Sequence, residues 1–240
     1  MNILVTGGTS GLGKAIVERL AAEPDNTVYF TYYKNAETAG LLMRTYPNVF
    51  SCPCDFTRES SVKAFLEQIK NWDLDVLINN AYSGNPQGVN FHKQDVSDFL
   101  DSFRTNVLPV ITITQEALAT FRKKKSGKII TILTAALFNL PPVGYSVYAA
   151  NKAYICQLSK SWSKEYIRYC ITSNCISPDF METTLTGETD PRIIEQMCAE
   201  HPLKRILTPG EVAGCVHFLV NAPAHINGVN IPMNAGMAIH

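Results

Sequence analysis

Short apolar runs alternate along the chain with longer stretches in which apolar residues recur every three to four positions. The runs predict buried strands, because near-continuous apolar segments are typical of strands that are covered on both faces. We expect strands over residues 3–5, 27–31, 48–52, 76–78, 128–133, 171–176 and 230–233. The helical spacing predicts helices over residues 12–20, 62–69, 107–121, 148–166 and 209–220, with Pro109 in a first turn.

The order of these elements is that of an α/β domain. Strands and helices alternate from one end of the chain to the other, without a break in composition or a linker rich in proline and glycine. Parallel strands need crossover connections, and helical crossovers place helices on both faces of the sheet. The pattern therefore predicts one domain over residues 1–240, with a doubly wound parallel sheet of about seven strands.

Composition and charge narrow the class of protein. Of the 240 residues, 46% are hydrophobic and 18% are charged, which is typical of a globular chain with a sizeable core. The 21 Lys and Arg residues balance the 21 Asp and Glu residues. This neutrality argues against a nucleic acid or an anionic membrane as the main partner. The chain has no run of about 18 apolar residues, so we expect no membrane-spanning helix.

The seven cysteines are scattered and indicate neither a disulfide framework nor a metal site. Cys52 and Cys54 flank a proline, but no second pair or nearby histidine completes a set of zinc ligands. The first residues show no basic segment followed by an apolar one, so we expect no secretory signal. These features predict a cytoplasmic protein without a bound metal.

A glycine-rich turn joins the first expected strand to the first expected helix. Its glycines have the spacing Gly-x3-Gly-x-Gly, which differs from the general Gly-x-Gly-x2-Gly fingerprint of dinucleotide-binding domains. A pyrophosphate needs close backbone approach and free N–H groups at a helix N-terminus, although tight strand–helix turns also recruit glycine for packing. We expect the nucleotide to bind at Gly7, Thr9, Ser10, Gly11, Leu12 and Gly13.

The end of the second expected strand bears on the choice of cofactor. An acidic residue at this place binds the ribose hydroxyls of NAD(H), but no carboxylate occurs between Asn26 and Ala36. Its absence removes repulsion against the 2′-phosphate of NADP(H), which Lys34 can attract. The sequence favours NADP(H). NAD(H) stays open, because most lysines are simply exposed.

Tyr148 and Lys152 lie four residues apart on an expected helix and therefore share a face. The pKa of an unperturbed tyrosine is about 10, which is high for acid–base catalysis at neutral pH. A fixed cation nearby stabilises phenolate and lowers that pKa. The pair therefore predicts a tyrosine that acts as general acid, although the same spacing also arises by chance on exposed helices.

The combination of motifs is more specific than any one of them. The glycine turn, Asn79-Asn80-Ala81, Asn106 and Tyr148-x3-Lys152 occur in this order at the ends of successive elements. With these motifs the whole chain resembles the short-chain dehydrogenase/reductase family, whose fold is Rossmann-like. The segments 202–213 and 227–237 resemble the tail of 3-oxoacyl-acyl-carrier-protein reductases. The resemblance implies an NAD(P)H-dependent reductase of a ketone, with a small-molecule or carrier-bound carbonyl, such as a 3-oxoacyl thioester, as substrate.

The resemblance also implies roles for individual residues. Tyr148 would protonate the substrate oxygen as hydride arrives, and Lys152 would bind the nicotinamide ribose while lowering the pKa of the phenol. Asn106 would hold a helix distortion and the water of a proton relay. The further cofactor-binding residues are Asp55 and Phe56 at the adenine, Asn80 and Ala81 at the ribose, and Pro178 and Thr183 at the nicotinamide.

Three positions depart from the family pattern. The family has serine about thirteen residues before the tyrosine, where this chain has Ala135; a loop longer by one residue puts Thr134 there, and we favour Thr134 as the catalytic hydroxyl. Tyr82 replaces a glycine and either crowds the cofactor or stacks on it. Asp179 replaces another glycine, and its charge would favour the oxidised nicotinamide.

Other readings of the same motifs stay open. One is an NAD-dependent alcohol or sugar dehydrogenase, and another is a catalytically silent homologue that acts as a cofactor-binding or partner subunit. Residues 183–202 begin without clear periodicity and predict a substrate lid. The resemblance implies a homo-oligomer, either a dimer or a tetramer, with a paralogue as an alternative partner.

Overall fold

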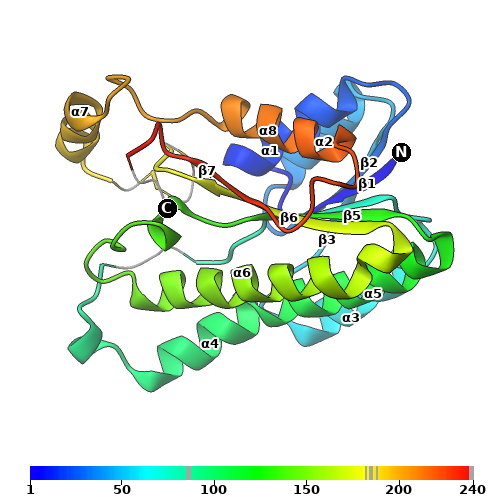
Figure 1. Cartoon of the computed structure of the whole chain (residues 1–240), viewed down its shortest axis with the longest axis horizontal. Coiled ribbons are helices and arrows are strands. Elements are labelled where there is room, and N and C mark those ends of the chain that lie inside the picture. Colours follow the sequence, from blue (N-terminus) through cyan, green and yellow to red (C-terminus); the bar gives the residue numbers. More distant parts are fainter. Residues whose placement is uncertain (85–87, 182, 184–185, 188, 238–240) are drawn as a thin grey trace.

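All seven expected strands are present in the computed structural model, which describes residues 1–84, 88–181, 183, 186–187 and 189–237. Their ends differ from the expected ones by at most two residues. Within the described residues they form one parallel sheet in the order β3-β2-β1-β4-β5-β6-β7, which confirms the doubly wound α/β fold (Figure 1). The strands are β1 Asn2–Val5, β2 Thr27–Tyr32, β3 Val49–Pro53, β4 Val76–Asn79, β5 Gly127–Ile132, β6 Ile171–Pro178 and β7 Asn230–Met233.

Helices cover both faces of the sheet. In Figure 1, α1, α2 and α8 lie on one face, and α3, α4, α5 and α6 lie on the other. The helices are α1 Gly11–Ala21, α2 Ala36–Thr45, α3 Glu59–Ile69, α4 Val96–Asn106, α5 Leu108–Lys124, α6 Ser146–Tyr166, α7 Pro191–Glu200 and α8 Pro209–Asn221. The five expected helices are confirmed, whereas α2, α4 and α7 were not predicted. None of the helices in the described ranges is long and apolar enough to cross a membrane.

Strand β1 shows why the central strands read as continuous apolar runs. Ile3 and Val5 belong to the core cluster that α1 and α8 cover, and Leu4 belongs to the cluster that α3 and α5 cover. All three side chains are fully buried. Alternate residues of a strand point to opposite faces, so a strand with a core on each side has no polar face.

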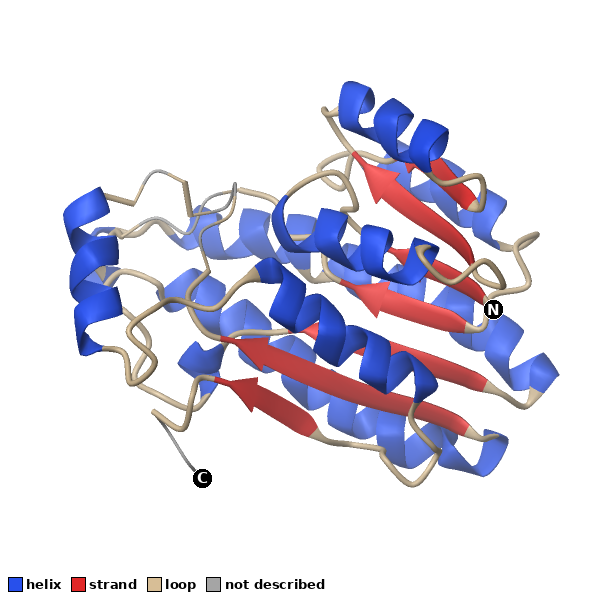
Figure 2. Ribbon diagram, turned by 90° about the horizontal axis from the view of Figure 1, so that it is seen from above, coloured by secondary structure: helices blue, strands red, loops and turns tan. Residues whose placement is uncertain are grey.

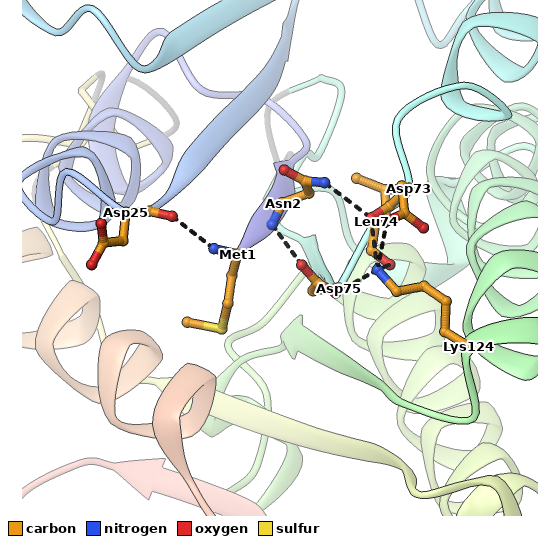
Figure 3. A network of polar contacts seen from close by, with 7 residues as sticks. All are labelled: Met1, Asn2, Asp25, Asp73, Leu74, Asp75 and Lys124. Carbon is orange, nitrogen blue, oxygen red and sulfur yellow. Dashed lines mark hydrogen bonds and ion pairs between the residues drawn. The ribbon is translucent and has the colours of Figure 1, made fainter.

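Polar contacts hold the amino edge of the sheet around the start of β1 (Figure 3). The backbone N–H of Asn2 donates a hydrogen bond to the carboxylate of Asp75, just before β4, at 2.8 Å. Lys124, the last residue of α5, donates to the same carboxylate at 2.6 Å and pairs with Asp73 at 3.2 Å. The network joins β1, β4 and α5 at the edge opposite the carboxyl ends of the strands.

The carboxyl ends of the strands define where a ligand can bind. The strand order reverses between β1 and β4, and in sheets of this kind ligands bind in the crevice at such a reversal. In Figure 2 all the strand arrows point toward the side of the molecule where α7 stands. The glycine turn follows β1, and Asn80 follows β4, so both lie at this crevice.

Candidate active site

The glycine turn between β1 and α1 has a backbone that suits glycine alone. Gly7 and Gly11 have φ angles of 73° and 48°, in the left-handed region. A Cβ added at Gly13 would overlap the carbonyl oxygen of Gly7 and would lie 2.7 Å from the side-chain nitrogen of Asn80. The turn therefore packs its own main chain too closely for any side chain at Gly13.

The first turn of α1 is suited to an anion. α1 begins at Gly11, and its N-cap residue Ser10 is exposed and makes no side-chain cap hydrogen bond. The first N–H groups of a helix have no partner within the helix and lie at the positive end of its dipole. Thr9 and Leu12 are buried, so Leu12 can meet a ligand only through its backbone. This arrangement fits a pyrophosphate.

Asn80 and Ala81 lie against the glycine turn. The Thr6 hydroxyl accepts hydrogen bonds from the backbone N–H of Asn80 at 2.9 Å and of Ala81 at 3.0 Å. The Asn80 side chain donates to the carbonyl oxygens of Thr6 at 2.9 Å and of Gly7 at 3.2 Å. The Asn80 amide therefore holds the ends of β1 and β4 together, whatever it contributes to a cofactor.

The residues expected at the adenine follow β3, and the residue expected at the 2′-phosphate follows β2. Burial raises the pKa of the Asp55 carboxyl, but hydrogen bonds from the Thr57 hydroxyl at 2.7 Å and backbone N–H at 2.9 Å outweigh it, and the pKa stays below its ordinary value. Phe56 is buried in the core, so only its backbone can face a ligand. Lys34 is exposed, with its ammonium 5.1 Å from the centre of the Tyr33 ring. Its charge is accessible to an anion.

The expected lid, residues 183–202, leaves the sheet after β6, which ends at the buried Pro178. Thr183 lies against the glycine turn, since a Cβ added at Gly11 would lie 3.0 Å from the Thr183 Cβ. A β-bridge joins Met181 to Leu207, so the two ends of the segment are held together. Residues 184, 185 and 188 fall outside the described residues. The described part contains α7, in which no side chain is buried.

Helix α6 brings Tyr148 and Lys152 to the same cluster, as their spacing predicts. The Lys152 side chain is only 5% exposed, and its ammonium donates a hydrogen bond to the carbonyl oxygen of Ile132 at 2.8 Å. Burial lowers the pKa of Lys152 to about 8. Burial also raises the pKa of Tyr148 to about 12, although a hydrogen bond with Thr134 lowers it.

The expected acidification of Tyr148 by Lys152 is therefore not present in this structure. The Lys152 ammonium is directed to a backbone carbonyl and lies 5.8 Å from the centre of the Tyr148 ring. The loss of water around the phenol outweighs the groups that stabilise phenolate. Tyr148 consequently stays protonated at neutral pH, which is the form that a proton donor requires.

The loop before α6 places the side chain of Thr134 at the Tyr148 phenol. Thr134 caps the 3-10 helix Ala135–Leu137, with its hydroxyl accepting a hydrogen bond from the Ala136 N–H at 3.3 Å. The same hydroxyl is the group that hydrogen-bonds Tyr148. Ala135 is 3% exposed and has no polar side chain to offer. The geometry places the Thr134 hydroxyl, and not position 135, beside the phenol.

Asn106 lies at a break between two helices, since α4 ends there and α5 begins at Leu108. Its side-chain oxygen accepts a hydrogen bond from the Ser83 N–H at 2.6 Å. Its amide donates to the Ser102 hydroxyl at 3.3 Å, and Asn151 of α6 donates to the same hydroxyl at 2.8 Å. Sequence reasoning missed Ser102 and Asn151. Asn151 stands inside the Tyr148-x3-Lys152 motif, which was the available signal.

Tyr82 lies with Tyr148 and Lys152. Its ring packs edge-on against the Tyr148 ring, with centroids 5.0 Å apart and planes at 77°. Its hydroxyl is 3.5 Å from that of Ser102, and burial raises its pKa. The Tyr82 side chain is thus packed between α4 and α6, and its expected role as a cofactor-binding residue stays a prediction.

Asp179 follows β6 and is only partly buried. Its carboxylate accepts a hydrogen bond from the adjacent Phe180 N–H at 2.8 Å, and its own N–H donates to the Met233 carbonyl at 3.1 Å. The carboxylate therefore supports the local backbone at the carboxyl end of β6. Its effect on a nicotinamide stays a prediction.

Comparison with known proteins identifies the family. The sequence model described as short chain dehydrogenase matches residues 1–193. The chain belongs to the short-chain dehydrogenase family. This dehydrogenase is 31% identical to the 3-oxoacyl-(acyl-carrier-protein) reductase MabA of Mycobacterium avium, over 99% of this chain and 90% of the relative. It is 30% identical to the 3-oxoacyl-(acyl-carrier-protein) reductase FabG of Aquifex aeolicus, over 98% and 96% of the two chains.

Solved structures give the same family. The structure of ElxO with NADP bound matches this dehydrogenase with a TM-score of 0.86 at 27% identity, over 98% of this chain and 97% of that one. A short chain dehydrogenase/reductase family protein also gives a TM-score of 0.86, at 29% identity over 98% and 96% of the two chains. This dehydrogenase is therefore an oxidoreductase with the fold and the motif order of a nicotinamide-dependent enzyme.

Proposed function

We propose that this short-chain dehydrogenase is an NADPH-dependent reductase that converts a ketone to a secondary alcohol, with a 3-oxoacyl thioester as its substrate class. The observation that carries the proposal is the placement of Tyr148, with Thr134 at its phenol, at the edge of the sheet that also holds the glycine turn. The names of the two relatives support the substrate class. The NADP in ElxO supports the cofactor.

The proposal assigns the cofactor to the residues that fit it. The N–H groups of the first turn of α1 would hold the pyrophosphate, with Thr183 closing on Gly11, since the N–H groups of Gly7 and Gly8 already bond to Thr31. Lys34 would hold the 2′-phosphate from the end of β2. The bound cofactor supplies the hydride that reduces the carbonyl carbon.

The chain's own residues supply the proton and its orientation. Tyr148 keeps its proton at neutral pH and gives it to the carbonyl oxygen as negative charge develops there. Thr134 donates a hydrogen bond at the same oxygen and so stabilises that charge. With a pKa of about 8, Lys152 is protonated about ten to one at pH 7, and it provides a positive charge beside the phenol.

A panel of carbonyl compounds tests the proposal. We expect NADPH to be oxidised with a 3-oxoacyl thioester, measured as loss of NADPH absorbance, and more slowly with simple ketones and sugars. Faster turnover of an alcohol or a sugar with NAD would favour the dehydrogenase reading. NADPH binding without oxidation by any member of the panel would favour a silent cofactor-binding homologue.

Replacing Lys34 by glutamate is expected to weaken NADPH binding by roughly 10- to 100-fold, because a carboxylate would then repel the 2′-phosphate. NADH lacks this phosphate, and a carboxylate at this place can bind its ribose hydroxyls, so its Kd should stay the same or fall. Fluorescence titration of both cofactors measures the two constants. Lys164→Glu, an equally exposed site at the far end of α6, is the control for net charge. Equal weakening of NADH and NADPH would contradict the assignment of Lys34.

Replacing Thr134 by alanine is expected to lower kcat by roughly 100-fold, because a donor to the developing oxyanion is lost. Thr134→Ser keeps the hydroxyl and should keep most of the activity. Steady-state rates of the two variants make the comparison. Activity in Thr134→Ala close to that of the unmodified protein would remove Thr134 from the catalytic residues.

We further propose that the chain self-associates through α4, α5 and α6. Apolar side chains on these helices are open to solvent, with Leu100 54%, Leu108 42% and Tyr154 46% exposed. The Phe103 and Tyr154 rings join α4 to α6 in one apolar surface, with centroids 5.2 Å apart.

We also assign the protein to the cytoplasm, a compartment that keeps thiols reduced, since its seven cysteines are free.

A further inference from the structure

Two phenol rings flank the buried ammonium of Lys152. The nitrogen lies over the Tyr82 ring at 5.3 Å from its centre, and over the Tyr148 ring at 5.8 Å. Both distances are within the range of about 6 Å over which a ring attracts a cation. The two rings also pack edge to face against each other, so they form one continuous aromatic surface around the ammonium.

The charge of Lys152 has no negative partner in the described part of the chain. Lys152 takes part in none of the ion pairs there, and its hydrogen bond goes to the neutral carbonyl of Ile132. Cys175 faces it from β6, but a hydrogen bond with Cys156 and burial raise the pKa of the Cys175 thiol well above its ordinary value. A neutral thiol does not balance an ammonium, so the ring faces carry more of the stabilisation.

The Tyr82 ring is held in place from two helices. Its hydroxyl lies 3.5 Å from the Ser102 hydroxyl of α4, which also accepts a hydrogen bond from Asn151 of α6. The next residue, Ser83, has its N–H bound to the side chain of Asn106. The main contact that orients the ring is its edge-on packing against the Tyr148 ring of α6, at 5.0 Å between centroids, and this contact does not need the hydroxyl.

We propose that Tyr82 is a positioning residue, whose ring forms with Tyr148 a two-ring cage that keeps the Lys152 ammonium charged and in place beside the phenol. The inference deepens the proposed function, because it concerns the pair that the proposed reaction uses.

Titration of the Lys152 side chain tests the cage directly. The protein is labelled with lysine carrying ¹³C and ¹⁵N, and the Lys152 signal is assigned by its loss in Lys152→Met. Three forms are compared by NMR between neutral and alkaline pH: the unmodified protein, Tyr82→Phe and Tyr82→Leu. Phenylalanine keeps the ring without the hydroxyl, whereas leucine fills much of the space without a π face.

We expect the unmodified protein and Tyr82→Phe to titrate alike, near pH 8. In Tyr82→Leu the midpoint should fall by roughly 0.5 to 1 pH unit, because the cation loses its ring face while the site stays apolar. The same midpoint in all three forms, or an upward shift in Tyr82→Leu, would overturn the cage. If Tyr82→Leu does not fold, as judged by circular dichroism, Tyr82→Met replaces it, and the same fall in the Lys152 midpoint is expected.

Kinetics separate the cage from the proposed function. In an active enzyme, the alkaline limb of kcat/KM for NADPH should move to lower pH in Tyr82→Leu and stay in place in Tyr82→Phe. A residue that only fills space would change stability without moving this limb. The NMR titration needs no substrate, so it decides on the cage even if no carbonyl is reduced.

Discussion

Replacing Tyr148 by phenylalanine is expected to lower kcat by about 10³-fold or more, while the Kd of NADPH changes by less than about threefold. The substitution removes only the O–H that protonates the substrate, and a positioned general acid contributes roughly 10²- to 10⁴-fold. The ring stays, with its packing against Tyr82 and Lys152. Steady-state rates with a 3-oxoacyl thioester and fluorescence titration of NADPH measure the two effects.

Tyr145→Phe is the matched control. The Tyr145 ring lies 6.3 Å from the Tyr148 ring at 86°, so the control removes a phenol from the same cluster. We expect this variant to keep most of its activity. An equal loss in the two variants would mean that the cluster, rather than the Tyr148 proton, limits turnover. Activity of Tyr148→Phe within about fivefold of the unmodified protein would end the assignment of the general acid.

Replacing Gly13 by alanine is expected to destabilise the fold by about 2–4 kcal/mol and to weaken NADPH binding by at least roughly 100-fold. The added methyl group would overlap the Gly7 carbonyl oxygen and approach the Asn80 amide. The Gly7 carbonyl belongs to the main chain, and the Asn80 amide is held by its hydrogen bonds to Thr6 and Gly7, so neither group can rotate out of the way. The start of α1 would therefore have to move. Urea unfolding gives the free energy, and fluorescence titration gives the Kd.

Gly214→Ala is the control for this change. Gly214 lies inside α8, and a Cβ added there meets no atom within 4 Å. Alanine should therefore stabilise this helix by roughly 0.5–1 kcal/mol. If Gly13→Ala were as stable as Gly214→Ala and bound NADPH normally, the close packing of the turn would be wrong.

The central strands β1 and β4 could be predicted because a core covers both of their faces, which favours an apolar run. The helices that were missed are those that bury little. In α4 the apolar side chains at Val96, Phe99, Leu100 and Phe103 have helical spacing, and a capping box joins Asp95 and Asp98. That signal was readable. In α7 no side chain is buried, but Asp190 caps the helix, Pro191 stands in its first turn, and Ile193, Ile194 and Met197 have helical spacing, so this signal was also present.

In the candidate site, the positions that follow strands and the i, i+4 pair on α6 could be predicted, because sheet topology and helical spacing place them. The directions of the side chains could not. Lys152 turns to the Ile132 carbonyl, and Tyr82 turns toward α4 and α6. The pKa of Tyr148 depends on how much water the cluster excludes, which spacing does not reveal.

The Thr6 hydroxyl has a practical consequence for redesign. It accepts the N–H groups of Asn80 and Ala81 after β4, and the Thr6 backbone leads into the glycine turn. Altering the glycine turn is therefore expected to disturb the end of β4 as well. Lys34 is exposed and lies outside this junction, so under the proposed function we expect a change there to alter cofactor preference without disturbing β4.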